Sequence, residues 1–227
     1  MWFRNVPLKQ MLIRREHINS DGLLGIWKME ETHEELLNYF PESLRTEAID
    51  YIKSVRSSRR SMEWLATRAM LFVLAGDDKS ILNYPDGRPY LSDRSHLISI
   101  SHTRDYAALL LHNSLPIGID IEERSERVKR VASKFISEKE YIDPTNKVLH
   151  QLLHWSAKET LFKRLNLREV DFKEHLFLHP FTPRDKGTIT AMESKTGGTR
   201  RFTVHYEVHD NYVLTWTVGF EKVANDG

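Results

Sequence analysis

The 227-residue chain has no cysteine, no long apolar run and almost no net charge. The absence of cysteine excludes disulfides, thiolate nucleophiles and zinc or iron–sulfur sites built on cysteine. The 33 Lys and Arg residues are balanced by 32 Asp and Glu residues, which disfavours bulk nucleic-acid binding because this needs a concentrated basic surface. Apolar runs such as residues 106–111 are too short to cross a bilayer. We therefore expect a soluble, cytoplasmic protein that binds neither nucleic acid nor membranes.

Apolar residues recur with helical and strand periods, and the order of these segments favours the α+β class. The patterns predict helices at residues 32–39, 44–55, 59–75, 128–136 and 146–165, and strands at residues 11–15, 23–29, 97–102, 106–112, 117–122, 176–181, 187–192, 202–208 and 212–220. Each half of the chain offers helices followed by strands. We therefore predict two packed α+β subdomains, residues 1–113 and 114–227, with the active site in the cleft between them.

Two short motifs have the form of a helix-capping box, in which a Ser or Thr is followed three residues later by Glu. Thr32 with Glu35 predicts the start of the first helix, and Ser137 with Glu140 predicts a further short helix. In a capping box each side chain accepts a hydrogen bond from the other residue's backbone N–H group.

The stretch I-G-I-D-I-E at residues 117–122 alternates apolar and acidic residues, which predicts a strand with Asp120 and Glu122 on one face. Acidic residues are unusual within an apolar strand, because burying an unpaired charge is costly. Gly118 removes a side chain where another group could approach closely. The alternative interpretation is a strand end that runs into solvent, with the acids forming a charged exit.

The stretch W-S-A-K-E-T-L-F-K at residues 155–163 predicts a helix with Glu159 and Lys163 one turn apart on the same face. Together with the strand acids, Glu159 gives three carboxylates that could hold a divalent cation, since magnesium prefers oxygen ligands. Lys158 and Lys163 could hold phosphate oxygens, and a carboxylate near the metal could take a proton from a hydroxyl group. Alternatively, Glu159 and Lys163 form an ordinary surface ion pair.

The order of these motifs closely resembles that of the 4'-phosphopantetheinyl transferases. The matching pieces are G-I-D-I-E at 118–122 and W-S-A-K-E at 155–159 followed by Lys163, with G-R-P at 87–89 and I-S-H-T at 100–103 further upstream. The resemblance covers roughly residues 59–165 and as a set is specific. The chain length indicates the longer type, like the surfactin-synthetase-activating enzyme, rather than the short trimeric holo-acyl-carrier-protein synthases.

The resemblance implies a monomer with pseudo-twofold α+β halves. Such an enzyme transfers the 4'-phosphopantetheine group of coenzyme A to a serine of an apo acyl or peptidyl carrier protein and releases adenosine 3',5'-bisphosphate. By position, Asp120, Glu122 and Glu159 would bind magnesium on the diphosphate. Glu159 would also be the catalytic base, directly or through water, with Lys163 beside it steadying the phosphates.

The same resemblance implies a set of residues that bind coenzyme A. Lys158 and Lys163 would hold the diphosphate, and the 3'-phospho-ADP end would contact Arg59, Arg60, Arg88, Ser101 and His102. Both arginines 59 and 60 lie at a predicted helix start, which suits an anion. The alternatives are a solvated helix start for these two arginines and a simple strand-end turn for residues 101–103.

The carrier protein is expected to dock near residues 165–178, where basic and apolar residues are interleaved and would suit an acidic partner. The alternative is an amphipathic connection with its apolar residues in the core. His150 and His154 resemble the zinc-protease motif H-E-x-x-H, but Gln151 replaces the glutamate that would act as base. We interpret these histidines as exposed polar positions of the helix.

Two rival functions are left open by the sequence. One is a magnesium-dependent phosphohydrolase or nuclease that directs the carboxylates at water. The other is a non-catalytic adaptor that binds carrier proteins or nucleic acid through the helix between Arg59 and Arg68.

Overall fold

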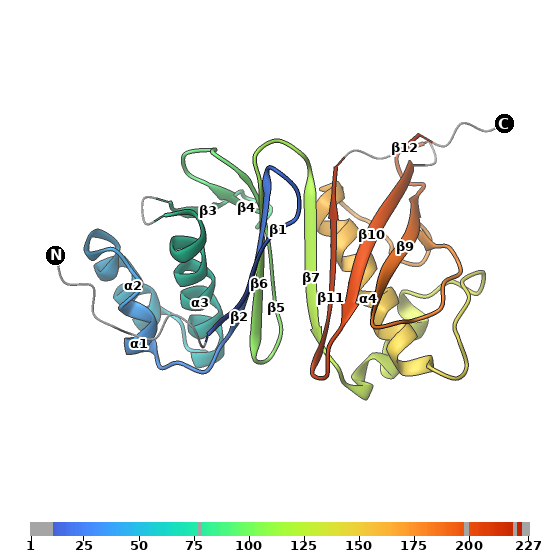
Figure 1. The fold of residues 1–227 in the computed structure, drawn as a ribbon, viewed down its shortest axis with the longest axis horizontal. Coiled ribbons are helices and arrows are strands. Elements are labelled where there is room, and N and C mark those ends of the chain that lie inside the picture. Colours follow the sequence, from blue (N-terminus) through green and yellow to red (C-terminus); the bar gives the residue numbers. More distant parts are fainter. Residues whose placement is uncertain (1–10, 77–78, 198–199, 220–221, 224–227) are drawn as a thin grey trace. The chain divides into compact units, whose positions relative to one another are not determined.

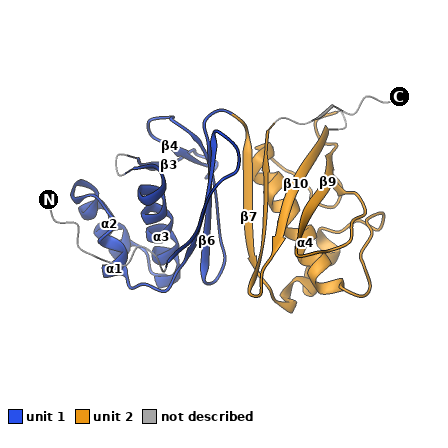
Figure 2. Ribbon diagram, viewed as in Figure 1, with its two compact units in different colours: residues 1–114 blue, residues 115–227 orange. Residues whose placement is uncertain are grey.

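A computed structural model describes residues 11–76, 79–197, 200–219 and 222–223. The chain forms two compact units, residues 1–114 and 115–227, where the sequence predicts 1–113 and 114–227 (Figure 2). Helices and strands are mixed in both units, which confirms the α+β class. No helix within the described ranges is long and apolar enough to cross a bilayer.

Unit 1 contains three helices and six strands in the described residues (Figure 1). They are β1 Leu12–His17, β2 Gly22–Lys28, α1 His33–Leu37, α2 Glu42–Ser54, α3 Ser58–Ala75, β3 Ile81–Asn83, β4 Pro89–Leu91, β5 Leu97–His102 and β6 Tyr106–His112. Four strands pair antiparallel in the order β1-β2-β6-β5, and β3 pairs with β4 in a small hairpin.

The core of unit 1 lies between α3 and the four-stranded sheet. Helix α3 contacts β2 and β6, and α1 and α2 pack against α3 (Figure 1). Leu65 and Ala69 of α3 are fully buried together with Leu109 of β6. Because residues four apart share a helix face, the apolar period of α3 aims one side of the helix at the sheet.

Unit 2 is built on a sheet in the order β7-β11-β10-β9-β8, with β12 paired to β10. Its elements are β7 Ile117–Glu123, the 3₁₀ helices η1 Glu126–Arg130 and η2 Ala132–Lys134, α4 Lys147–Leu165, β8 Leu176–Leu178, β9 Lys186–Glu193, β10 Arg200–Val208, β11 Tyr212–Val218 and β12 Lys222–Val223. Helix α4 lies along the sheet in contact with β7, β11 and β10 (Figure 1). Leu153, Ala157 and Leu161, spaced by four, are buried against Val204 and Val213.

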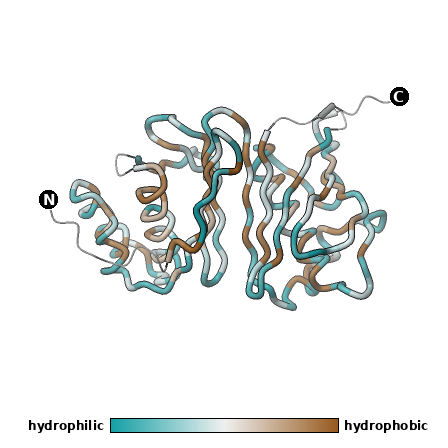
Figure 3. The backbone as a smooth tube through the Cα atoms, in the orientation of Figure 1, coloured by the Kyte–Doolittle hydropathy of each residue, from teal (hydrophilic) through white to brown (hydrophobic). Residues whose placement is uncertain are grey.

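Most predicted elements are confirmed within a few residues, because their apolar periods are also the periods of burial. In Figure 3 hydrophobic stretches lie mainly along strands and helices, and hydrophilic ones at turns. The strand predicted at 176–181 is shorter, and the helix predicted at 128–136 is two 3₁₀ helices. Strands β3 and β4 were not expected. The predicted end of the last strand, Phe220, lies outside the described residues.

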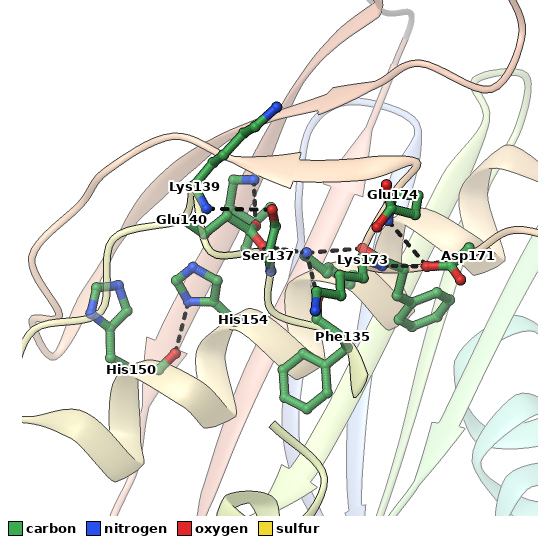
Figure 4. Close-up of polar contacts among 12 residues, drawn as sticks. Phe135, Ser137, Lys139, Glu140, His150, His154, Asp171, Lys173 and Glu174 are labelled. Atoms are coloured by element: carbon green, nitrogen blue, oxygen red, sulfur yellow. Dashed lines mark hydrogen bonds and ion pairs between the residues drawn. The ribbon is translucent and has the colours of Figure 1, made fainter. Parts of the chain in front are cut away.

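The two capping-box motifs have different outcomes. Thr32 and Glu35 form the complete box at the start of α1, as predicted. Ser137 and Glu140 begin no helix, so that prediction is wrong. The Glu140 carboxylate does accept the backbone N–H of Ser137, at 2.8 Å (Figure 4). Its other contacts are deep in unit 2, where it takes part in a buried ion pair described below.

Gly118 brings β7 and α4 into close contact. A Cβ atom at this position would lie 2.1 Å from the backbone oxygen of Thr160 and 3.0 Å from Cβ of Arg164, both on α4. The space that the sequence predicted beside Gly118 is therefore taken by the helix. Residues 118, 120 and 122 share a strand face, so the two acids also face α4.

We expect Gly118→Ala to lower the free energy of unfolding by about 1–3 kcal/mol, because a backbone oxygen cannot rotate away as a side chain can. Urea denaturation measures the change. Gly22→Ala is the matched control, since its closest contact is the side-chain oxygen of Asn19 at 3.1 Å, which can move. Equal stability of the two variants would show that β7 and α4 do not pack this closely.

Candidate active site

The candidate site lies where one face of β7 meets one face of α4. The face of β7 that carries Asp120 and Glu122 is turned toward the helix, as the contact at Gly118 shows. On α4 the residues Trp155, Glu159 and Lys163 are spaced by four, so they form one row along the helix. The strand and helix motifs therefore meet, and they do so within unit 2.

Specific contacts link the two elements. The amine of Lys163 donates to Oδ1 of Asp120 at 2.8 Å and to the backbone oxygen of Ile119 at 3.2 Å. The indole N–H of Trp155 donates to Oε1 of Glu122 at 2.7 Å. Asp120 is only 3 % exposed. The interpretation of the acids as a solvent-exposed strand end is therefore wrong for Asp120.

The acids repel one another in a partly desolvated setting. Burial, reinforced by the charge of Asp120, raises the pKa of Glu122 to about 7. The pKa of Glu159 is also raised to about 7 by burial and then by Asp120, while Lys163 acts in the opposite direction. A positive charge placed among carboxylates held in this way stabilises their ionised form.

The donor set of Asp120, Glu122 and Glu159 fits magnesium in its chemistry, since all three offer oxygens from two adjoining elements. As placed, no group of three or more His, Asp or Glu side chains in the described part of the chain is arranged to hold a metal ion. In this arrangement the ammonium group of Lys163 supplies positive charge at Asp120. Coordination by all three acids requires their side chains to turn toward a common point.

Residues 116–217 match the model of the 4'-phosphopantetheinyl transferase superfamily. The match supports phosphopantetheinyl transfer in general, and with it a transferase. It covers less than half of the chain but includes every residue of the cluster between β7 and α4. A comparison with curated proteins found no match.

Outside the matched residues 116–217, two of the predicted coenzyme A residues in unit 1 contact the same carboxylate, that of Glu63. Arg59 donates from Nε to Oε1 of Glu63 at 2.8 Å, and Nδ1 of His102 lies 3.3 Å from the same oxygen. Glu63 is buried, while Arg59 and His102 are exposed. The sequence interpretation did not include Glu63, although the i, i+4 spacing of Arg59 and Glu63 on a helix indicates such a pair.

The other predicted residues of unit 1 lie in separate settings. Arg60 is exposed in the first turn of α3, and its backbone N–H donates to the side chain of Ser57 at 3.3 Å. Arg88 donates to Asp86 at 2.9 Å in its own turn between β3 and β4. Ser101 is buried on β5.

Lys158 differs from the prediction made for it. Its side chain and that of Glu140 are both 0 % exposed, and their charged groups lie 2.7 Å apart. The Lys158 amine also donates to the backbone oxygens of Phe135 at 2.7 Å and Phe172 at 2.9 Å. All three of its hydrogens thus have acceptors inside unit 2. A phosphate contact does not fit this placement.

In residues 165–178, the segment predicted to receive the carrier protein, most apolar side chains pack against the core of unit 2. Leu176 is buried in the core of unit 2, and Leu165, Val170 and Phe172 pack against that core. This supports the alternative that the segment is an amphipathic connection. Arg168 remains exposed on it.

The two histidines of the decoy motif are buried, so the expectation that they are exposed is wrong. Their exposures are 0 % for His150 and 1 % for His154. His150 accepts the backbone N–H of Asp143 through Nδ1 at 2.8 Å. His154 donates from Nδ1 to the backbone oxygen of His150 at 3.0 Å, as Figure 4 shows. Stacking of His154 on Phe181, at 5.4 Å between ring centroids, completes an aromatic layer. Both histidines thus have a structural role in the interior of unit 2.

This burial predicts acid sensitivity. Burial lowers the pKa of His154 to about 3, so below the ordinary pKa of histidine the unfolded chain binds a proton that the folded protein does not. Stability is then lost as the pH falls below about 6.5. When the pH is lowered from 7 to 5, we expect the free energy of unfolding to fall by about 2 kcal/mol less in His154→Gln than in the wild type. Urea denaturation at both pH values measures it, with His17→Gln at an exposed position as control.

Proposed function

We propose that this protein transfers the 4'-phosphopantetheine group of coenzyme A to a serine of an apo acyl or peptidyl carrier protein. The reaction would depend on magnesium and release adenosine 3',5'-bisphosphate. We also propose that the chain is of the longer, monomeric type, with pseudo-twofold halves and the substrate between them.

The electrostatic coupling of Asp120, Glu122 and Glu159 beside Lys163, within the part of the chain that matches the superfamily, is the observation that carries this proposal. Three carboxylates on two packed elements are costly to keep together without a cation. The raised pKa values of Glu122 and Glu159 show the cost of burial and of the neighbouring negative charge. A site for a divalent cation and a diphosphate accounts for the arrangement.

Asp120, Glu122 and Glu159 would hold the magnesium ion, which would offset the charge of the diphosphate when bound. Lys163, partly exposed beside Asp120, would donate to a diphosphate oxygen. In unit 1, Arg59 and His102 would bind the 3'-phosphate end, with Arg60, Arg88 and Ser101 as further contacts. Lys158 is no longer among the proposed ligands, because it is buried.

Glu159 would accept the proton of the carrier serine, directly or through one water molecule. Its pKa near neutrality suits a base that must take up a proton at physiological pH. The serine oxygen then forms a bond to the phosphorus next to the pantetheine arm, and the P–O bond within the diphosphate breaks. The adenosine bisphosphate leaves with the electron pair. The rate acceleration would come from positioning of the substrates and stabilisation of charge, with no covalent enzyme intermediate.

The direct test is incubation of the protein with coenzyme A, magnesium and a panel of apo carrier proteins, followed by intact mass measurement. Transfer adds the mass of one phosphopantetheine group to the carrier, and chelation of the metal should abolish this gain. Cleavage of coenzyme A without a gain on any carrier would instead support the phosphohydrolase. If neither product forms, the result would support a non-catalytic adaptor. The panel also identifies which class of carrier is used.

A further inference from the structure

Trp155 combines a partly buried aromatic contact with a directed hydrogen bond. Its ring lies 5.1 Å from that of Phe135 and 5.8 Å from that of Phe172, measured between centroids. Its N–H group donates to Oε1 of Glu122 at 2.7 Å. These ring contacts use the apolar faces and edges of the indole, so packing alone does not require its N–H group.

The backbones of the two flanking phenylalanines are held by one side chain. Lys158 donates to the carbonyl oxygens of Phe135 and Phe172, at 2.7 and 2.9 Å. Its third hydrogen bond goes to Glu140, at 2.7 Å. The amine therefore ties the end of η2 and the segment before β8 to helix α4. Between them lies the ring of Trp155.

Glu140 anchors this arrangement to the rest of unit 2. Its carboxylate accepts the backbone N–H groups of Ser137 and Leu178, each at 2.8 Å, in addition to the bond from Lys158 (Figure 4). All oxygens and hydrogens of the buried pair thus have partners, as a charge pair inside a protein requires. The result is a rigid frame around the indole ring.

We propose that Trp155 is a positioning residue that orients the Glu122 carboxylate toward a divalent cation, and that Lys158 holds the frame in which Trp155 sits. This rests on the proposed function, which assigns Glu122 to the cation. A carboxylate with one oxygen fixed by an N–H donor presents its other oxygen in a defined direction. Partners of this kind fix the orientation of metal ligands and strengthen binding.

The test uses Trp155→Phe, which keeps an aromatic ring in the frame, removes the N–H donor and makes the ring smaller. Binding of Mn²⁺ to the purified protein is measured by electron paramagnetic resonance, without coenzyme A or carrier. We expect the dissociation constant to rise about 10- to 100-fold, the usual effect of losing a partner of a metal ligand. In transfer assays the KM for magnesium should rise, while the KM for coenzyme A at saturating magnesium stays within about twofold of the wild type.

The chain contains a matched control. The indole N–H of Trp27 in unit 1 donates to Oε1 of Glu31 at 2.9 Å, and Glu31 is not among the proposed metal ligands. Trp27→Phe therefore removes the same type of bond and should leave Mn²⁺ binding unchanged. A second variant carries benzothienylalanine at position 155, in which sulfur replaces the N–H group within a ring of nearly the same shape. It keeps the test valid if the phenylalanine variant does not fold.

The outcomes separate the two proposals. If the wild type binds no Mn²⁺ and transfers nothing, the proposed function fails and this inference falls with it. If the wild type binds Mn²⁺ and a folded variant without the N–H group at position 155 binds it equally well, only the positioning role of Trp155 is overturned. Weaker binding in both position-155 variants, with Trp27→Phe unchanged, supports the inference.

Discussion

Glu159→Gln should lower the rate of phosphopantetheinyl transfer by about a thousandfold or more, while the protein remains folded. The amide can neither accept the serine proton nor contribute negative charge to the cation. Burial and the neighbouring Asp120 already oppose ionisation of this carboxyl group. A neutral amide should therefore not lower the free energy of unfolding near pH 7. Single-turnover transfer followed by intact mass, together with urea denaturation, gives both quantities.

Asp120→Asn should have a comparable effect on transfer, because it removes a second oxygen charge from the same cluster. The matched control is Glu123→Gln, one residue along β7 from Glu122 and therefore on the opposite strand face. It should retain nearly full activity. Full activity in purified Glu159→Gln would remove the assignment of the site.

Lys158→Met should lower the free energy of unfolding by about 3–5 kcal/mol, because it leaves the Glu140 carboxylate buried without its counter-charge. It also leaves the carbonyl oxygens of Phe135 and Phe172 without their donor. Urea denaturation measures the loss. The double variant Lys158→Met/Glu140→Gln should recover part of it, since the uncompensated charge is then gone.

The control for this prediction is Lys163→Met, at a lysine whose side chain is 26 % exposed. Its effect on stability should be smaller than that of Lys158→Met, because water reaches the lysine end of its ion pair with the buried Asp120, and it should instead raise the KM for coenzyme A. The opposite pattern would contradict the structure. If Lys158→Met keeps wild-type stability and raises the KM for coenzyme A, then Lys158 binds phosphate as the family resemblance implies.

Periodicity explains which parts of the fold could be predicted. The strand at 117–122 and the helix at 146–165 were expected close to the positions of β7 and α4, because alternation and four-residue spacing record which side is buried. The row of Trp155, Glu159 and Lys163 follows from the same spacing. The family resemblance identified the acids, but the spacing alone left a surface ion pair as an alternative.

Contacts between residues far apart in the sequence could not be predicted from periodicity. Lys158 and Glu159 are neighbours in sequence, yet a rotation of about 100° per helical residue turns one toward a buried partner and the other toward Asp120. The partner, Glu140, was expected in a capping box because only its local spacing was visible. Glu63 was missed for a similar reason, since its link to His102 joins α3 to β5.

The tight contact at Gly118 has a practical consequence for capturing the reaction. The separation of strand and helix depends there on one backbone oxygen and the absence of a side chain, and not on the charges of the acids. Amide replacements at Asp120 or Glu159 should consequently preserve the contour of the unreacted site. Such slow variants are suited to crystallisation with coenzyme A and an apo carrier, because both substrates could be held together long enough to be seen.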